Sequence, residues 1–213
     1  MMHDDRETEL TTIAQISEVV DMLNLFVDDE QRTQLLAYCE EVIRWNARVN
    51  VTGARCAAQF AAGPLFDALT LLTVLDETHR SFVDIGSGGG LPAIPMAILK
   101  PNIHITMVEP RQKRVRFLQH LVDGFQLNAE VLHTQDRELI QPAFDGASAQ
   151  AVFPPKKWIQ RARKILGENG RIYTLTSEPI TPAMCPANVH IDVQLSFSRD
   201  GKERYAARLA KRV

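Results

Sequence analysis

A glycine-rich turn stands out as the segment of this sequence that could do chemistry. The residues Asp84-Ile85-Gly86-Ser87-Gly88-Gly89-Gly90 follow directly on an apolar run that begins at Phe82. Glycine has no Cβ, so the backbone of such a turn can come close to a ligand, and the free amides at the start of a following helix favour polar or anionic groups. Glycine-rich turns also occur without any ligand. The turn alone therefore leaves a nucleotide site and a structural turn equally open.

A carboxylate further along the chain narrows the choice of ligand. Glu109 lies 19 residues after Gly90, where a Rossmann-like fold places the acid that hydrogen-bonds the ribose. The dinucleotide fingerprint would continue with another glycine, but this chain continues with Leu91 and Pro92, which serves a pyrophosphate poorly. We therefore expect a cofactor that has a ribose but no diphosphate, and Asp84 suits the amino-acid tail of S-adenosylmethionine.

Two alternatives follow from the same residues. An NAD-dependent oxidoreductase is disfavoured, because the fingerprint is incomplete and the sequence offers no Tyr-x-x-x-Lys or catalytic-histidine arrangement. Asp84 and Glu109 could instead act as helix caps or solvated surface residues, although their joint spacing favours the cofactor site.

The elements that would position these residues can be inferred from apolar spacing. Residues 13–25 and 31–50 follow helical spacing, and a further helix is expected over 65–75, with Pro64 at its start. Short apolar runs then alternate with helical stretches, which predicts a largely parallel sheet covered on both faces. The expected strands are 82–85, 103–108, 130–132, 147–153 and 172–176, and the expected helices are 94–99, 113–125 and 158–166.

The C-terminal residues predict a hairpin, because extended stretches at 189–197 and 204–209 flank Asp200-Gly201. The expected fold is thus α/β. It has an N-terminal helical extension over residues 1–76 and a Rossmann-like domain over residues 77–213.

Composition excludes several classes of protein. With 45% hydrophobic and 23% charged residues in 213, the chain is neither disordered nor collagen-like. It has no apolar run of membrane-spanning length, and it does not begin like a secretory signal, so we expect a cytoplasmic protein. Cys39, Cys56 and Cys185 lack metal-ligand spacing, so we expect reduced thiols and no metal site.

Charge is unevenly distributed. Residues 1–150 hold 12 Lys and Arg against 21 Asp and Glu, whereas residues 151–213 hold 12 against 5. The basic C-terminal third suits an anionic partner or a solvated surface. The basic run at 111–116 and Lys156-Lys157-Trp158 could contact RNA, although solvated helix faces are the more common role of such runs. We expect Trp45 to belong to the core.

Several segments together resemble one family. Arg44-Trp45-Asn46-Ala47-Arg48-Val49-Asn50-Val51-Thr52 resembles its Trp-Asn-x-x-x-Asn-Leu-Thr segment, and Leu65-Phe66-Asp67-Ala68-Leu69 resembles its Phe-Leu-Asp-Ser-Leu segment. The turn from Asp84 to Pro95, and Glu109 with Lys113-Arg114-Val115 and Phe117-Leu118, continue the likeness. The family is that of the bacterial small-subunit (16S) ribosomal RNA guanine-N7 methyltransferases of the glucose-inhibited division protein B type, and the resemblance covers residues from about 35 to 210.

The resemblance implies a Rossmann-like fold, S-adenosylmethionine as cofactor, and methyl transfer to guanine N7 of 16S rRNA in the small ribosomal subunit. We expect a monomer that needs neither metal nor membrane. The implied cofactor-binding residues are Asp84, Gly86, Ser87, Gly88, Gly90 and Glu109, with Asp136 and Arg137 beside the adenine. The catalytic residues are not identified, and the candidates are Gln150, Asn50 and Asp67.

The chain departs from the family pattern where that pattern has cations. Gly63-Pro64 replaces a basic residue and a histidine, Gln150 replaces an arginine, and Thr176 replaces a lysine. Glutamine cannot reproduce the bidentate contact of an arginine. This leaves two alternatives open: a non-catalytic S-adenosylmethionine-binding protein, and a methyltransferase with another RNA or a small molecule as substrate. Arg199 or Arg204 could restore the lost charge.

Overall fold

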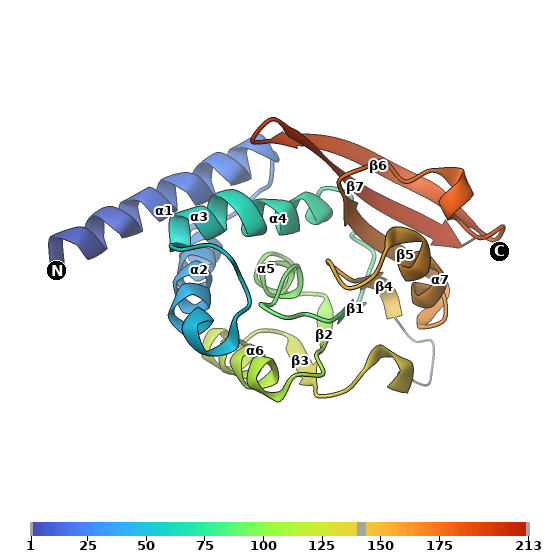
Figure 1. The fold of residues 1–213 in the computed structure, drawn as a ribbon, viewed down its shortest axis with the longest axis horizontal. Helices are drawn as coiled ribbons and strands as arrows, with labels where there is room; N and C mark the ends of the chain where they lie inside the picture. The colour runs from blue at the N-terminus through green and yellow to red at the C-terminus, as the bar shows by residue number, and fades with distance from the viewer. Residues whose placement is uncertain (1, 140–143, 212–213) are drawn as a thin grey trace.

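The computed structural model describes residues 2–139 and 144–211, without the side chains of residues 2–8 and 136. A seven-stranded sheet forms its centre, with strand order β3-β2-β1-β4-β5-β7-β6 (Figure 1). The first five strands are parallel, and β7 runs antiparallel to both of its neighbours. The strands are β1 (Ser81–Ile85), β2 (His104–Val108), β3 (Ala129–Leu132), β4 (Phe144–Ser148), β5 (Leu166–Thr176), β6 (Val189–Arg199) and β7 (Lys202–Lys211).

Helices precede the sheet and connect its parallel strands. The N-terminal group comprises α1 (Met2–Met22), α2 (Asp29–Val49), α3 (Ala57–Phe60), the π-helical turn η1 (Ala61–Leu65) and α4 (Phe66–Leu72). The connecting helices are α5 (Ala93–Leu99), α6 (Gln112–Phe125) and α7 (Pro155–Ala162), with short 3-10 turns η2 (Asp136–Glu138) and η3 (Pro182–Met184). No helix among the described residues is long and apolar enough to cross a membrane.

The start of α2 shows how the sequence sets an element boundary. Asp28 accepts a hydrogen bond from the Gln31 backbone at 2.8 Å, and the Gln31 side chain accepts one from the Asp28 backbone at 3.2 Å. This reciprocal capping box satisfies two backbone donors that a helix start otherwise leaves without partners. It fixes where α2 begins, and α2 carries Tyr38, whose hydroxyl donates to the carbonyl of Gly89 in the glycine turn.

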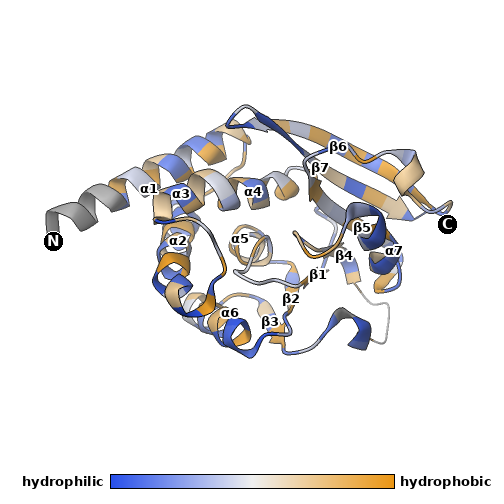
Figure 2. Cartoon of the chain, viewed as in Figure 1, coloured by the Kyte–Doolittle hydropathy of each residue, from blue (hydrophilic) through white to orange (hydrophobic). Residues whose placement is uncertain are grey.

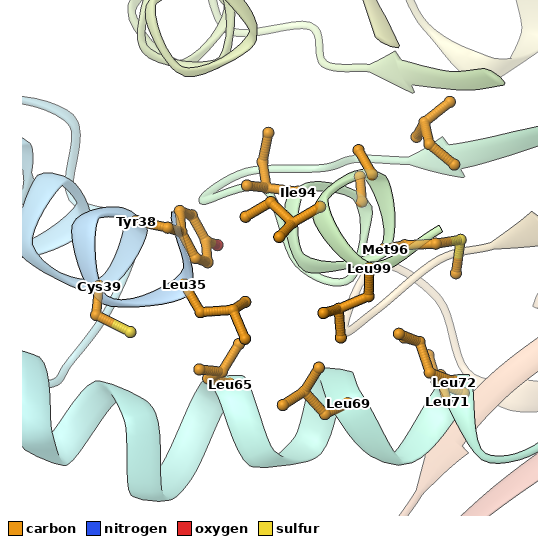
Figure 3. Close-up of a cluster of buried hydrophobic side chains, with 14 of the residues drawn as sticks. Leu35, Tyr38, Cys39, Leu65, Leu69, Leu71, Leu72, Ile94, Met96 and Leu99 are labelled. Atoms are coloured by element: carbon orange, nitrogen blue, oxygen red, sulfur yellow. The ribbon is translucent and has the colours of Figure 1, made fainter. Parts of the chain in front are cut away.

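Two buried clusters cover the two faces of the sheet. Successive side chains of a strand point to opposite faces, and accordingly Phe82 joins one cluster while Val83 and Ile85 join the other. The first cluster lies between α2, α4 and α5 (Figure 3). It includes Leu35, Tyr38 and Cys39 of α2, Leu69 and Leu72 of α4, and Ile94, Met96 and Leu99 of α5.

The first cluster contains residues from both sides of position 76, where we expected the helical extension to end. It packs side chains of α1 and α2 together with those of the sheet and its connecting helices. Burying a single such aliphatic side chain contributes roughly 1.5–3 kcal/mol. The N-terminal helices are therefore held against the same core that positions the glycine turn.

The expected hairpin is confirmed. Asp200 and Gly201 both have positive φ, at 51° and 69°, as a tight turn between antiparallel strands requires. Along β6 and β7, hydrophilic and hydrophobic residues alternate (Figure 2), which is typical of strands with one face packed on a core.

Several sequence-based boundaries are wrong. We expected Pro64 at a helix start, but it lies inside the π-helical turn η1, between α3 and α4. The Phe66 amide reaches back to the Ala61 carbonyl, and this wider turn accommodates a proline that has no N–H to donate. Apolar spacing does not distinguish a new helix from a continued one.

The end of β4 is the second wrong boundary. The apolar run at 147–153 predicted one strand, but β4 ends at Ser148. Ala151 takes a positive φ of 56°, and Val152 turns back toward the glycine turn. The helix expected at 158–166 likewise ends at Ala162, and Leu166 begins β5 instead.

Candidate functional site

The glycine turn lies at the point where the sheet changes direction. From β1 the chain builds outward through β2 and β3, and then returns to the other side of β1 as β4. In open parallel sheets of this kind, ligands bind beyond the carboxyl ends of the strands at this switch point. The turn follows Ile85 at the end of β1, and Gln150 follows closely on Ser148 at the end of β4.

Two glycines of the turn are required by its geometry. Gly86 has a φ of +74°, and a Cβ on it would lie 2.6 Å from a methyl carbon of Val152. Gly90 has a φ of +91°, and a Cβ on it would lie 2.5 Å from Ile94. Both a left-handed backbone and close contact exclude larger residues at these positions. Gly90 thus allows α5 to pack closely behind the turn.

Asp84 is the buried acid at the base of the turn. Its side chain is 0% exposed, and its Oδ1 accepts a hydrogen bond from the Ser148 hydroxyl at 2.6 Å. Its Oδ2 has no partner among the described residues. Burial raises the pKa of Asp84 to about 7, against the lowering effect of the Ser148 hydrogen bond. A buried carboxylate oxygen without a partner favours a cationic donor beside it.

Glu109 forms the second acidic position, directly after β2. It is 2% exposed, and its two oxygens accept the backbone N–H groups of Gly88 at 3.0 Å and Arg111 at 2.9 Å. A carboxylate has about four acceptor positions in all. Glu109 therefore holds the glycine turn in place and still has capacity for further hydroxyl donors.

The N-terminal helices close one side of the turn. The Tyr38 hydroxyl donates to the Gly89 carbonyl at 2.8 Å, and Val51 lies 3.2 Å from the position of a Cβ on Gly89. Asn50, at the left-handed C-cap of α2, accepts a hydrogen bond from Arg114 through its backbone oxygen at 2.8 Å. Asn50 thus reaches the site region through its backbone.

Asp67 lies in a charged cluster with the C-terminal hairpin. Its carboxylate is 2.5 Å from Arg199 and 3.9 Å from Arg204, and Arg199 also donates to the Gly63 carbonyl at 2.8 Å. Burial raises the pKa of Asp67, against the lowering effect of Arg199. The hairpin therefore brings a guanidinium to the position where the family pattern has a basic residue.

This cluster lies toward the same edge of the sheet as the glycine turn. Thr176, the last residue of β5, pairs with Tyr205 of β7, next to Arg204, and β5 is separated from β1 only by β4. The Thr176 hydroxyl itself donates to the Glu178 carbonyl at 2.6 Å.

The remaining predicted residues fall into three groups. Ser87 is 3% exposed and donates to the Asp84 carbonyl at 3.0 Å. Gln150 is half-buried and has no hydrogen bond within the part of the chain that the structure describes. Arg137 is exposed in η2 after β3, and the side chain of Asp136 lies outside the described residues.

Three contributors were not identified from the sequence: Ser148, Tyr38 and Val152. Ser148 offered one signal, a polar residue between Ala147 and Ala149 in the run expected as a strand. Tyr38 and Val152 offered none, because each contacts the turn from a segment remote in sequence. Across residues 2–139 and 144–211, no group of three or more His, Cys, Asp or Glu side chains could hold a metal, and the three cysteines are free.

Solved structures share this fold. A mutant of MtNAS in complex with S-adenosylmethionine matches with a TM-score of 0.58 and 13% identity, over 85% of this chain and 73% of that one. TrmN from Thermus thermophilus matches with a TM-score of 0.53 and 21% identity, over 68% and 48%. These likenesses define the fold class as Rossmann-like.

Sequence comparison identifies the family within that class. Residues 31–181 match the family model GidB, described as rRNA small subunit methyltransferase G. The protein of that name from Erwinia tasmaniensis is 30% identical over 168 residues, covering 76% of this chain and 80% of the relative. Its counterpart from Stutzerimonas stutzeri is 36% identical over 132 residues, covering 61% of each. The chain belongs to this family.

Proposed function

We propose that this chain transfers the methyl group of S-adenosylmethionine to N7 of a guanine in 16S rRNA. Family membership supports the reaction. The observation that carries the cofactor assignment is the unpartnered, fully buried Oδ2 of Asp84 beside the glycine turn. A residue buried in this way costs stability unless a partner compensates it, and the ammonium group of the cofactor is a suitable partner.

Each cofactor-facing residue has a proposed role. Asp84 accepts a hydrogen bond from the ammonium group, and Glu109 accepts the ribose hydroxyls with its remaining acceptor capacity. Gly86, Ser87, Gly88 and Gly90 bring the backbone close to the cofactor, because side chains at the glycines would block the approach. Asp136 and Arg137 follow β3 and are proposed to contact the adenine.

The reaction requires little of the protein beyond positioning the cofactor and the guanine base. S-adenosylmethionine supplies an electrophilic methyl group on a sulfonium. The guanine N7 lone pair forms the new N–C bond as the S–C bond breaks, and the charge passes to the ring without release of a proton. No general base is required, so alignment of the two reactants provides much of the rate. The base must be accessible or unstacked, as is typical of RNA recognition.

The candidate catalytic residues are proposed as positioning groups on the substrate side. Gln150 follows β4 at the switch point, Asn50 borders the turn, and Asp67 is held by Arg199. Arg199 and Arg204 bring guanidinium groups close to Gly63 and Thr176, where the family pattern has cations, and Arg199 is paired with Asp67 and Asp200. Membership of a methyltransferase family favours a retained reaction over a binding protein without catalysis.

We propose the small ribosomal subunit as the partner and a cytoplasmic monomer as the working form. Ribosomal RNA is the substrate named for the relatives. A protein that modifies it must meet ribosomal particles or their precursors, which the basic C-terminal third of the chain would assist.

The test combines cofactor binding with methyl transfer. Calorimetric titration with S-adenosylmethionine should show one site, and labelled methyl should enter one guanine of small subunits that lack the modification. Asp84→Asn and Glu109→Gln should weaken binding. Binding without transfer to subunits or naked RNA would favour the non-catalytic alternative. Transfer to another RNA or to a small molecule instead would show that 16S rRNA is not the substrate.

A further inference from the structure

A pocket near the glycine turn has the chemistry of a nucleotide-binding site. It lies between the end of α2 and the start of α6 and has a volume of about 500 Å³, within the range of roughly 300–1,000 Å³ common for small-ligand sites. Its floor is apolar and its rim is cationic. The lining residues are Trp45, Ala47, Arg48, Val49, Lys113 and Arg116.

The aromatic floor is held in a fixed orientation. Trp45 packs against the first cluster, as expected of a core residue, but it is only partly buried and also lines the pocket. Its ring lies 5.6 Å from Phe117 and 5.2 Å from His120 between centroids, and its Nε1 donates to Glu41 at 3.1 Å. A ring fixed in this way loses little freedom when a planar group stacks on it.

The cations on the rim have no counter-charges. Arg48, Lys113 and Arg116 are exposed, and within the described part of the chain none of them forms a salt bridge or side-chain hydrogen bond. The neighbouring carboxylate, Glu41, is already paired with Arg44 and with His120. The start of α6 adds the partial positive charge of a helix N-terminus. The rim therefore favours an anion.

Arg114 lies between the pocket and the glycine turn, and in sequence it stands between the lining residues Lys113 and Arg116. Its guanidinium donates to the Asn50 carbonyl and lies 3.6 Å from the position of a Cβ on Gly88. Residues 49–51 thus have the pocket on one side and the glycine turn on the other.

We propose that this pocket binds a nucleotide of the RNA substrate that neighbours the target guanine. Its base stacks on Trp45, and the adjoining phosphates contact Arg48, Lys113 and Arg116. Stacking platforms surrounded by cations are the usual means of holding single-stranded RNA. The pocket would anchor the strand while the target base enters the site beyond the turn. This inference rests on the proposed function for the identity of the strand.

Tryptophan fluorescence reports on the pocket without requiring activity. The chain has two tryptophans, and Trp158 is 1% exposed, so a short single-stranded RNA oligonucleotide should quench Trp45 saturably. Trp45→Phe keeps an aromatic ring and should abolish the quenching. Reversing the rim charges with Arg48→Glu, Lys113→Glu and Arg116→Glu should weaken RNA affinity about tenfold or more, and lower the salt slope by about 0.7 per lost phosphate contact.

Controls separate this inference from the proposed function. Arg80→Glu, at an exposed position before β1 and so at the sheet edge opposite the glycine turn, makes a matched charge change and should leave quenching and affinity unchanged. All variants should bind S-adenosylmethionine like the parent protein and melt at similar temperatures.

Each outcome has one interpretation. If the parent protein methylates small subunits while the charge reversals leave RNA affinity and KM unchanged, the pocket inference is wrong. If the oligonucleotide quenches Trp45 and the reversals abolish this, but no methyl transfer occurs, the pocket inference stands and the proposed function fails. Quenching by phosphatidylserine vesicles but not by RNA would assign the pocket to a membrane surface and overturn the inference.

Discussion

Cofactor affinity should depend on pH through Asp84. The pKa of this carboxyl is raised to about 7 by burial, and we propose that its ionised form receives the ammonium group of S-adenosylmethionine. Asp84 should therefore be about half ionised near pH 7 and only a few per cent ionised near pH 5.5. Because binding selects the ionised form, affinity should fall about 16-fold between these pH values, or about 1.6 kcal/mol.

The raised pKa of Asp84 also makes the stability of the fold depend on pH. The folded pKa of about 7 lies above the unfolded value of about 3.9. Between these values the folded protein holds a proton that the unfolded chain releases. The contribution of Asp84 to stability is thus fully present below about pH 3.9 and is lost as pH rises toward 7, by up to about 1.4 kcal/mol per pH unit.

Calorimetric titration of the parent protein and of Asp84→Asn tests both effects. The variant should bind S-adenosylmethionine weakly with a nearly flat pH profile between about pH 5.5 and 7, and its stability in urea should vary less with pH than that of the parent. Staying below pH 7 avoids titration of the cofactor's own amino group, expected near pH 8. Equal affinity at both pH values, or equal profiles for the two proteins, would refute the role of Asp84.

The remaining predictions concern three other positions. Glu109→Ala should weaken S-adenosylmethionine binding by about 1–3 kcal/mol, because the ribose loses its carboxylate partner; unchanged affinity in calorimetry would exclude this site. Gly86→Ala should destabilise the fold by about 1–2 kcal/mol in urea titration, because φ is +74°, and adding Val152→Ala should relieve only the contact part. Arg199→Ala should cost about 1–2 kcal/mol, because the half-buried Asp67 keeps only the more distant Arg204 as a partner, with partial recovery in Arg199→Lys; no change in the urea midpoint would contradict this role.

The sequence predicted those parts of the site that are formed by residues close together along the chain. The glycine turn after an apolar run, and Glu109 at the end of the next strand, follow from strand spacing alone and are found together, joined by the hydrogen bond from Gly88 to Glu109. The parallel sheet and the hairpin follow equally from alternating apolar runs and from Asp200-Gly201.

Contacts between distant segments could not be predicted in this way. Arg199 donates to Gly63 across 136 positions of sequence, and only the antiparallel pairing of β7 with β5 brings the hairpin near α4. The end of β4 and the placement of Pro64 were wrong for a related reason. Apolar runs predict burial, not backbone conformation: residues 61–66 stay buried or partly buried through the π-helical turn, whereas the apolar Ala151 and Val152 beyond β4 are exposed.

The function proposed for this protein is methyl transfer from S-adenosylmethionine to guanine N7 of 16S rRNA. The most direct measurement incubates the purified protein with labelled S-adenosylmethionine and with small subunits that lack the modification, and locates the label in the RNA. We expect one methyl group per particle, at N7 of a single guanine, with transfer reduced by Asp84→Asn. Tight cofactor binding with no label in the RNA would contradict it.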